Sequence, residues 1–514
     1  MKSRTLIIIA LALLSFSYIY AQQSFDSDTI VVTRWLDDST RPITYDEYIE
    51  SRDFSPSANI KQISTPTITT DIMIDIFVNE DLYPQIESVL DTFLFDLRLD
   101  GYGVNLYTAL ETQSPNSLRD TLYNHWQNQE IEGVILIGDL TVPWYEMDEP
   151  WDPYNFVTFP CDLYFMDLDG TWGDSDYDGI FDSHTNPDYY ADIWVGRLYA
   201  STMTDYGADE VSILQNYFRK NHQYRIGDLR LTDHALAFID NDWNTSGWGN
   251  DVALAFPNTN AITDIYETSR QNYINNVAEV ADSQYEHVLI CSHSSPYAHY
   301  IYYNEDSYQL FHNEEIESYM MQALSYNLFA CSNARFIEYN NMGGWYIYET
   351  EYGLLSVGST KTGSMLCFED YYWPLGSGAS YGQAFLSWTQ TDIESCAGSS
   401  SRGWFYGMCI QGDPTLKVAR FQEPIVYCDY IPGDINGDGN VLGSDVTYSV
   451  RYFKGVGEPP PDSCWDEETS GWLYVGGDVN GTCEFLGSDI TYLVSYFRGV
   501  NDSILHCPRF PILE

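Results

Sequence analysis

Cys331 and His293 are the residues of this sequence best suited to covalent catalysis. Each stands at the end of an apolar run, His293 after "EHVLICS" and Cys331 after "YNLFA". In parallel sheets, ligands gather beyond the carboxyl ends of strands, so two neighbouring strands would bring the imidazole and the thiol to one crevice. Thiolate chemistry needs a basic neighbour, and the imidazole supplies it. The two residues therefore predict nucleophilic catalysis by a Cys–His dyad.

Other interpretations of this pair stay open at the level of sequence. A cysteine in an apolar strand is usually a packing residue, and a cysteine of an exported protein is often half of a disulfide. The chain has ten cysteines. Because this number is even, all of them could be paired, and the count alone does not point to a free thiol. His299 follows His293 closely enough for a metal-binding pair, although no nearby Cys/His spacing is typical of a zinc site.

Three acidic segments place oxygen ligands at alternate positions, which is the spacing of calcium loops. Carboxylates crowd "GDSDYDGIFDS" so densely that they would repel one another without a cation. Near the C-terminus, "GDINGDGNVLGSD" fits an EF-hand-like loop and is repeated as "GDVNGTCEFLGSD". The repeat has Cys483 where glycine is expected, which predicts weaker binding. The predicted calcium ligands are Asp174, Asp176, Asp178 and Asp182 in the first segment, Asp434, Asn436, Asp438, Asn440 and Asp445 in the second, and Asp478, Asn480, Thr482 and Asp489 in the third.

Alternating strands and helices must position these residues. Short apolar strands alternate with helices over residues 70–228 and again over residues 229–424, where His293 and Cys331 lie. This alternation predicts an α/β domain of two subdomains with mainly parallel strands, arranged as two sheets or as one composite sheet. Residues 22–69 are polar and could form a pro-segment, a linker or an ordered arm. Residues 427–507 are predicted to form a separate, small α-helical domain around the two repeated calcium loops.

Residues 1–21 have the anatomy of a secretory signal peptide. Lys2 and Arg4 precede an apolar run, and Ala21 is a small residue before the predicted cleavage point. No later apolar run reaches the roughly 20 residues that span a bilayer. We therefore expect a secreted or cell-surface protein without a transmembrane anchor. The formal net charge of −52 argues against nucleic acid as a partner, because phosphate binding needs basic patches.

Further motifs resemble the gingipain family of cysteine peptidases, which belongs to the caspase-like clan. In chain order they are "VILIGDLTVPW", "PCDLYFMDLDGTWGDSDYDGIFDS", "ADIWVGRLYAST", "LLSVGSTKTG" and "MCIQGDPTLKV". With the histidine and cysteine segments, they span roughly Asp71 to Val418. The resemblance implies a caspase/gingipain-like catalytic domain of two subdomains. It also implies a cysteine-type endopeptidase that hydrolyses peptide bonds of protein substrates.

The resemblance also assigns roles to individual residues of the dyad. Cys331 corresponds to the nucleophile and His293 to the catalytic histidine. Ser294 stands where the family usually has glycine, and its backbone N–H would hold the oxyanion together with that of Cys331. A third, carboxylate member corresponds to Asp240 or Asp242 in "FIDNDW".

The resemblance implies a substrate-binding role for Asp251 in "GWGNDVAL". Arginine-specific relatives carry an acidic residue of the S1 pocket at this position, so Asp251 would favour Arg or Lys at P1. The same residue could instead be an acid in the first turn of a helix, where it complements the helix dipole.

Residues 427–499 resemble a type I dockerin, a calcium-folded module that docks into cohesin domains. Leu442 and Leu486 stand where dockerin loops often carry a polar ligand. Cys428, Cys464, Cys483 and Cys507 are predicted to form two disulfides of unassigned connectivity in this region.

The predicted function is therefore a secreted cysteine endopeptidase with a calcium-dependent docking module. Two alternatives remain at this level. The chain could be a catalytically inactive gingipain-like adhesin, in which Ser294 marks lost activity. It could also be a component whose main role is docking to a cohesin-bearing scaffold.

Overall fold

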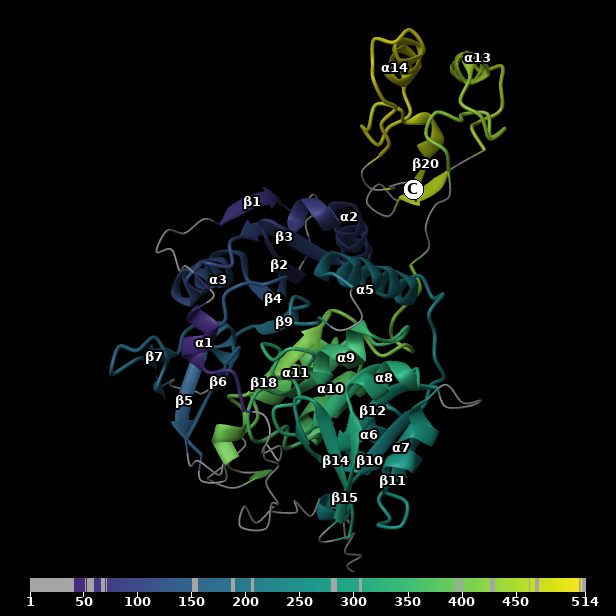
Figure 1. The fold of residues 1–514 in the computed structure, drawn as a ribbon. Helices are drawn as coiled ribbons and strands as arrows, with labels where there is room; N and C mark the ends of the chain where they lie inside the picture. Colours follow the sequence, from purple (N-terminus) through teal and green to yellow (C-terminus); the bar gives the residue numbers. More distant parts are fainter. Residues whose placement is uncertain are drawn as a thin grey trace, which may run out of the picture.

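A single large sheet forms the centre of the α/β body (Figure 1). The computed structural model describes residues 41–50, 52, 60–65, 70, 72–149, 156–185, 190–204, 208–278, 284–304, 307–392, 396–397, 401–425, 430–461, 463–466, 471–507 and 510. Within these residues eleven strands pair in the order β1-β3-β2-β4-β9-β18-β17-β16-β12-β10-β11. In that order, their bounds are Lys61–Ser64, Tyr102–Ala109, Ile72–Asn79, Ile131–Ile137, Trp194–Leu198, Met408–Gly412, Leu355–Ser359, Ala323–Phe329, Tyr285–Cys291, Ala235–Ile239 and Thr259–Ile262.

The sheet is composite, and β18 joins its two halves. Strands within each half run parallel, except that β1 pairs with β3 in the antiparallel sense. β18 runs parallel to β9 but antiparallel to β17, so the two halves point in opposite directions. The carboxyl ends of β10, β12 and β16 therefore lie together at one edge of the sheet.

Helices cover the sheet. Most of its central strands are therefore buried along their whole length, as expected for parallel strands with both faces covered. Helix α2 packs on α5 and α5 on α9, while α11 packs on α10 and α10 on α6. The helices whose bounds the structure describes in the body are α1 (Tyr45–Glu50), α2 (Tyr83–Leu99), α3 (Pro115–Gln129), α4 (Leu163–Met166), α5 (Glu210–Arg225), α6 (Trp248–Ala255), α7 (Arg270–Val277), α8 (Glu314–Ser318), α9 (Met342–Tyr348), α10 (Glu369–Gly376) and α11 (Tyr381–Thr389), with short 3₁₀ turns at Asn241–Trp243 and Ser401–Trp404. None of the described helices is both long and apolar enough to span a membrane.

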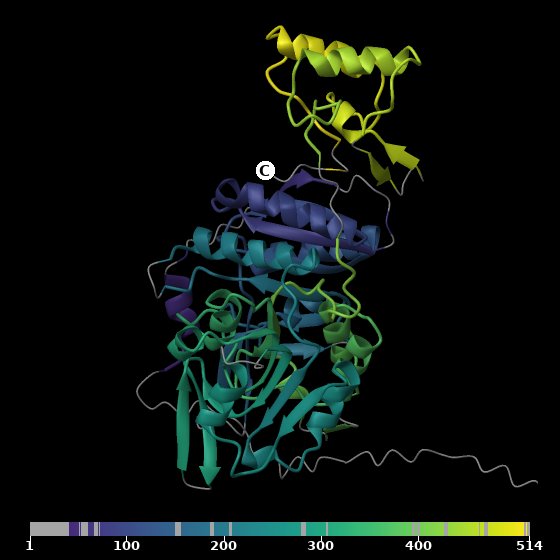
Figure 2. The same cartoon turned by 90° about the vertical axis from the view of Figure 1, so that its right-hand side faces the viewer.

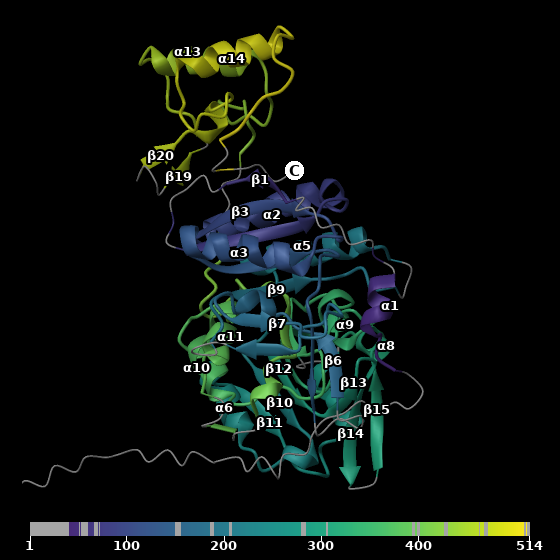
Figure 3. The same cartoon turned by 90° about the vertical axis from the view of Figure 1, so that its left-hand side faces the viewer.

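In the described part of the body, three small antiparallel sheets stand beside the main sheet. They are β5 (Trp144–Asp148) with β6 (Phe156–Pro160), β7 (Thr171–Gly173) with β8 (Ser183–Thr185), and β13 (His293–Ser295) with β14 (Ala298–Asn304) and β15 (Ser307–His312). The hairpin of β14 and β15 extends at the end of the body farthest from the C-terminal module (Figure 3). Strand β13, which pairs with β14 in the same small sheet, follows β12 directly and carries His293.

The described part of the N-terminal segment packs on the body. The rings of Tyr45 and Tyr48 in α1 each lie 5.6 Å from the ring of Trp144, and Arg335 donates to the carbonyl of Ile43. Strand β1 also comes from this segment and pairs with β3. The predicted signal peptide, residues 1–21, lies outside the described residues.

The C-terminal module stands clear of the α/β body in all three views (Figures 1, 2 and 3). Its helices α13 (Gly443–Phe453) and α14 (Gly487–Phe497) pack against each other, beside the small sheet of β19 (Cys464–Asp466) and β20 (Gly471–Leu473) and the 3₁₀ turn Val475–Gly477. Ile435, Val479 and Leu493 form the centre of its small core.

Candidate active site

The ends of β12 and β16 place His293 and Cys331 at the same level of the sheet. These strands pair in parallel, and Cys291 is the partner of Phe329 at their last shared position. The amide of Ser292 donates to the carbonyl of Phe329 at 3.1 Å. His293 and Cys331 each follow two residues after that last pair, and both are buried. The register of the strands therefore brings the imidazole-bearing and thiol-bearing segments side by side.

His293 is oriented by a carboxylate on one ring nitrogen. Its Nε2 lies 2.8 Å from Oδ2 of Asp242, which belongs to the 3₁₀ turn after β10. The rings of Trp243 and Tyr302 pack around the imidazole, with centroids 4.9 and 5.2 Å away. The other nitrogen, Nδ1, is buried and has no hydrogen-bond partner in the described structure. A proton on Nε2, donated to Asp242, would leave the lone pair of Nδ1 for a reacting group.

Cys331 is a thiol rather than half of a disulfide. Its Sγ accepts a hydrogen bond from the amide of Gly363 at 3.4 Å. The residue after it, Ser332, has a φ of +53°, so the chain turns sharply away from the strand at this point. The disulfide interpretation of Cys331 is therefore excluded.

His299 has other partners than a metal. Its Nδ1 lies 3.1 Å from Oγ of Ser292, and its Nε2 lies 3.0 Å from the hydroxyl of Tyr346. Burial lowers its pKa to about 3, so the ring is neutral and hydrogen-bonded inside the core. Both ring nitrogens are engaged, which argues against a metal pair with His293.

The two candidate carboxylates after β10 have different partners. Asp242 contacts His293, whereas Oδ2 of Asp240 accepts the amide of Tyr302 in β14 at 2.6 Å. Burial raises the pKa of Asp240 to about 7. Asp242 is thus placed to orient the imidazole of His293. Asp240 instead holds the hairpin that carries Tyr302, whose ring packs against the same imidazole.

Ser294 connects the two segments of the site. It pairs with His299 in the β13–β14 ladder, and its hydroxyl donates to the carbonyl of Cys331 at 2.6 Å. The side chain of Ser294 therefore ties β13 to the main chain of the thiol residue.

Asp251 lies in the first turn of α6, facing the start of α10. Burial and then the charges of Glu369 and Asp370 raise its pKa to about 7. Trp248, one turn earlier, packs on Phe329 with ring centroids 4.7 Å apart. Asp251, Glu369 and Asp370 thus form an acidic group on two neighbouring helices, α6 and α10.

The acidic loop between β7 and β8 is closed by its own carboxylates. Asp174 accepts the amides of Tyr177 and Gly179, and Asp182 accepts the amide of Ser175. Asp178 accepts the amide of Ile180 at 2.9 Å.

Glu146 of β5 joins this loop, and the sequence did not indicate it. Carboxylate oxygens of Glu146, Asp176 and Asp178 lie within 4.8 Å of one another. Burial, then the charges of Asp178 and Asp176, raise the pKa of Glu146 to about 7. Like charges this close, with oxygen atoms only, fit a calcium ion. Asp167, Asp169 and Asp192 form a second group of this kind nearby.

The first C-terminal loop is organised by an aspartate at each end. Asp434 accepts the amides of Asp438 and Gly439, and Asp445 accepts that of Ile435.

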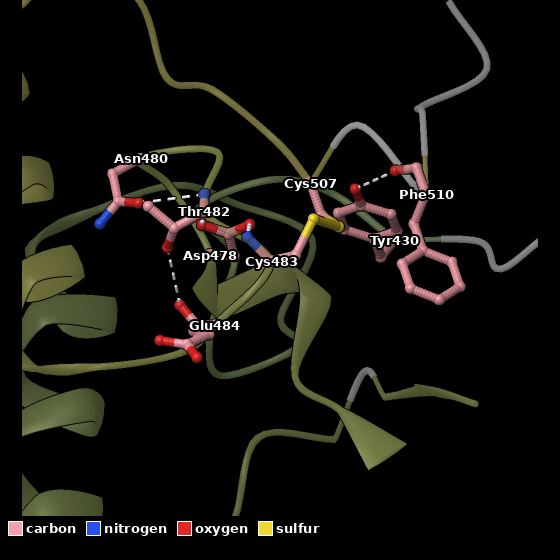
Figure 4. Close-up of a disulfide and its surroundings, with 8 residues drawn as sticks. All are labelled: Tyr430, Asp478, Asn480, Thr482, Cys483, Glu484, Cys507 and Phe510. Atoms are coloured by element: carbon pink, nitrogen blue, oxygen red, sulfur yellow. Dashed lines mark hydrogen bonds between the residues drawn. A yellow bond between two sulfur atoms is a disulfide. The ribbon is translucent and has the colours of Figure 1, made fainter. Parts of the chain in front are cut away.

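The second C-terminal loop also has an aspartate at each end, and Figure 4 shows the first of them, Asp478, beside Thr482 and Cys483. Asp478 accepts the amides of Thr482 and Cys483, at 3.0 and 2.7 Å, and Asp489 accepts that of Val479. Cys483 has a φ of +59°, a conformation that glycine adopts most easily, and it forms a disulfide with Cys507.

The remaining described disulfide cysteines include one of the predicted set and two that were not predicted. Cys464 is disulfide-bonded, whereas Cys428 lies outside the described residues. A further disulfide, Cys367–Cys396, was not assigned from the sequence.

Comparison with known proteins identifies one family. A family model described as peptidase family C25 matches residues 104–419. Two solved structures are similar over most of the chain. "Crystal structure of the Arg specific cysteine proteinase gingipain R" is 12% identical, covers 73% of this chain and 84% of that chain, and has a TM-score of 0.48. "Structure of Protease" is 10% identical, covers 72% and 84%, and also has a TM-score of 0.48. No curated protein matches the chain.

Proposed function

The chain belongs to peptidase family C25 and is a cysteine peptidase, and on this premise we propose that Cys331 is its nucleophile and His293 its general base and acid. The observation that carries the proposal is the register of β12 and β16, which delivers both residues to one edge of the sheet. The carboxylate of Asp242 on Nε2 of His293 supports it, because catalytic imidazoles are commonly oriented in this way.

In the proposed mechanism, Nδ1 of His293 takes the thiol proton and Sγ of Cys331 attacks the scissile carbonyl carbon. The carbonyl oxygen becomes an oxyanion, to which the backbone N–H groups of Ser294 and Cys331 would donate. The imidazolium then gives its proton to the leaving amine, and the C–N bond breaks to leave a thioester. Water, deprotonated by His293, attacks the thioester and releases the acid product, returning the thiol.

Asp251 is proposed to favour Arg or Lys at P1. Its position beside Glu369 and Asp370 supports a site that attracts a cationic side chain. Cleavage of matched peptides with Arg, Lys, Leu or Asp at P1 would test this. Asp251→Asn is expected to reduce the preference for Arg and Lys, and a preference that stays unchanged would refute the assignment.

We further propose that calcium binds the acidic loop of the body through Asp174, Asp176, Asp178 and Asp182, together with Glu146, and binds the two loops of the C-terminal module. When bound, calcium would neutralise the crowded carboxylates and stabilise the loops that hold them. Calcium titration monitored by thermal unfolding tests this, and a melting temperature that is the same with calcium and with chelator would contradict it.

Export is proposed from the signal-peptide anatomy of residues 1–21. Expression of the full chain with N-terminal sequencing of the product in the medium tests it. A product that keeps Met1 and stays inside the cell would contradict export.

Docking to a cohesin domain is a second proposed function, which can coexist with proteolysis. The observation that favours it is a repeated set of exposed apolar side chains on the C-terminal module. They are Leu442, Phe453 and Val456 in one copy and Leu486, Phe497 and Val500 at the equivalent positions of the other. A pull-down with purified cohesins, using the full chain with and without calcium, tests this role.

Covalent labelling separates an active peptidase from an inactive adhesin or scaffold of the same fold. A peptidyl acyloxymethyl ketone is expected to modify Cys331 in the wild-type chain and to leave Cys331→Ala unlabelled. The same variant is expected to lose all peptide hydrolysis while its near-UV circular dichroism stays unchanged. Full hydrolysis by Cys331→Ala would refute the proposed mechanism.

A further inference from the structure

The loop after β17 wraps around the segment that carries the thiol. The amide of Ser332 donates to the carbonyl of Lys361, and the amide of Ala334 donates to that of Ser359, at 2.9 and 3.1 Å. On the other side of Cys331, the hydroxyl of Ser364 donates to the carbonyl of Leu328. Between these contacts the amide of Gly363 points at Sγ. The position of the sulfur is therefore tied to the conformation of residues 359–364.

A buried ion pair holds this loop. The ammonium of Lys361 lies 2.8 Å from Oε2 of Glu149, and the two side chains are only 1% and 6% exposed. Lys361 also donates to the carbonyl of Thr362 at 2.6 Å, directly before Gly363. Its Nζ lies 3.6 Å from the point where a side chain on Gly363 would begin. The charge of Lys361 is thus placed next to the amide that contacts the thiol.

Other charged groups around Cys331 are accounted for by different contacts. His293 is held by Asp242. Arg335, in the segment after Cys331, pairs with Glu338 and donates to the carbonyl of Thr360. Arg335 thus also contacts residues 359–364, through Thr360, but Lys361 lies on this loop itself and donates to the carbonyl directly before Gly363.

From this geometry we infer that Lys361, paired with Glu149, is a positioning residue that holds the Gly363 amide on the sulfur of Cys331 and so favours its thiolate. A thiolate accepts a hydrogen bond more strongly than a thiol does, so a correctly held amide stabilises the reactive form. The inference rests on the proposed role of Cys331 as nucleophile. Neither Lys361 nor Glu149 touches the substrate in this scheme.

The test uses the full chain and two variants of the pair. Glu149→Gln keeps an oxygen acceptor for Lys361 but removes the negative charge of the carboxylate. Glu149→Gln combined with Lys361→Met removes both charges of the pair. The double variant avoids an isolated buried charge, which would itself destabilise the protein. Lys220→Met is the matched control, because Lys220 is an equally buried lysine that donates to the carbonyls of Ile347 and Thr350, away from Cys331.

The measurements are the rate of Cys331 alkylation by iodoacetamide between pH 5 and 9 and the kinetics of peptide hydrolysis. In the double variant, the midpoint of alkylation is expected to move to higher pH. We expect kcat to fall by about 10-fold, the order expected for losing one hydrogen bond to a charged group, while KM stays nearly unchanged. Lys220→Met is expected to melt at a lower temperature with an unchanged alkylation profile.

A folded double variant whose alkylation profile and kcat equal those of the wild type would overturn the inference. Should the double variant fail to fold, the profile of Glu149→Gln decides, and an unshifted midpoint refutes the inference. A wild-type Cys331 that neither the peptidyl probe nor iodoacetamide modifies would overturn it too, and would refute the proposed nucleophile as well.

Discussion

Replacing Asp242 by alanine is expected to slow catalysis without weakening substrate binding. The carboxylate is 2.8 Å from Nε2 of His293, and its side chain is 29% exposed, so water screens the contact only in part. A hydrogen bond to a charged group contributes roughly 1.5–3 kcal/mol. Because each 1.36 kcal/mol changes a rate about 10-fold, kcat is expected to fall roughly 10- to 100-fold.

Asp242→Asn is expected to have a smaller effect than the alanine variant. The amide oxygen can still accept the Nε2 proton and keep the ring oriented, but it no longer stabilises the imidazolium that forms during the reaction. We therefore expect a loss of kcat of about 10-fold or less. KM is expected to change little in both variants, because neither removes a contact with the substrate.

Initial rates on a fluorogenic peptide, with near-UV circular dichroism to monitor folding, measure these effects. Asp96→Asn is the matched control, because Asp96 lies 3.0 Å from Nδ1 of His222 in the distant α2–α5 pair. This control is expected to keep the wild-type kcat. A folded Asp242→Ala with wild-type kcat, or an equal loss of kcat in Asp96→Asn, would refute the orienting role.

Three further predictions concern stability and calcium. The pKa of Asp240 is raised from 3.8 to about 7, so the folded state favours the neutral acid and stability falls as the pH rises from about 4 to about 7. This fall in the free energy of unfolding is at most roughly 4 kcal/mol. Urea unfolding of Asp240→Asn is expected to lack it and so to depend less on pH. Chelation is expected to lower the melting temperature of the body, and differential scanning calorimetry should show a smaller calcium effect in Asp178→Asn. Cys507→Ser is expected to weaken calcium binding at Asp478 in calorimetric titration, whereas a second change, Cys483→Gly, is expected to restore it, because glycine adopts a positive φ without the disulfide. Calcium affinity that stays unchanged in Cys507→Ser would show that the disulfide does not support the loop.

The positions of His293 and Cys331 could be predicted because they depend on strand ends, which apolar runs mark clearly in the sequence. The choice between Asp240 and Asp242 could not be made in the same way. The two residues are separated by one position, so an extended chain would point both side chains the same way. The 3₁₀ turn at Asn241–Trp243 instead sends Asp242 to the imidazole and leaves Asp240 facing β14.

The sequence also predicted the extent of the sheet only in part. The two alternating regions allowed either two sheets or one, and the answer depends on β18, which lies next to both β9 and β17. That pairing is long-range and has no local signal. The same is true of β1, whose four residues lie in a polar segment and become a strand only by pairing with β3.

The sequence did not indicate Glu146, Glu149 and Lys361, because each acquires its contacts from partners far away in the sequence. A weak signal did exist for Lys361, which is a lone lysine among small residues directly after an apolar strand, in "VGSTKTGS". A cation in such a place must find a buried anion or remain in water. The sequence alone does not show which of 75 acids supplies that anion.

Strand β5 links the two sites that the sequence presented separately. Its residue Glu146 faces the acidic loop, and the amide of Glu146 donates to the carbonyl of Phe181 inside that loop. Three residues later, Glu149 holds Lys361 and with it the loop that contacts the sulfur of Cys331. The acidic loop is therefore connected to the thiol by contacts along one short strand and one buried ion pair. On this route, a cation bound by Asp176, Asp178 and Glu146 would do more than relieve repulsion, because fixing Glu146 also fixes the backbone from which Glu149 extends.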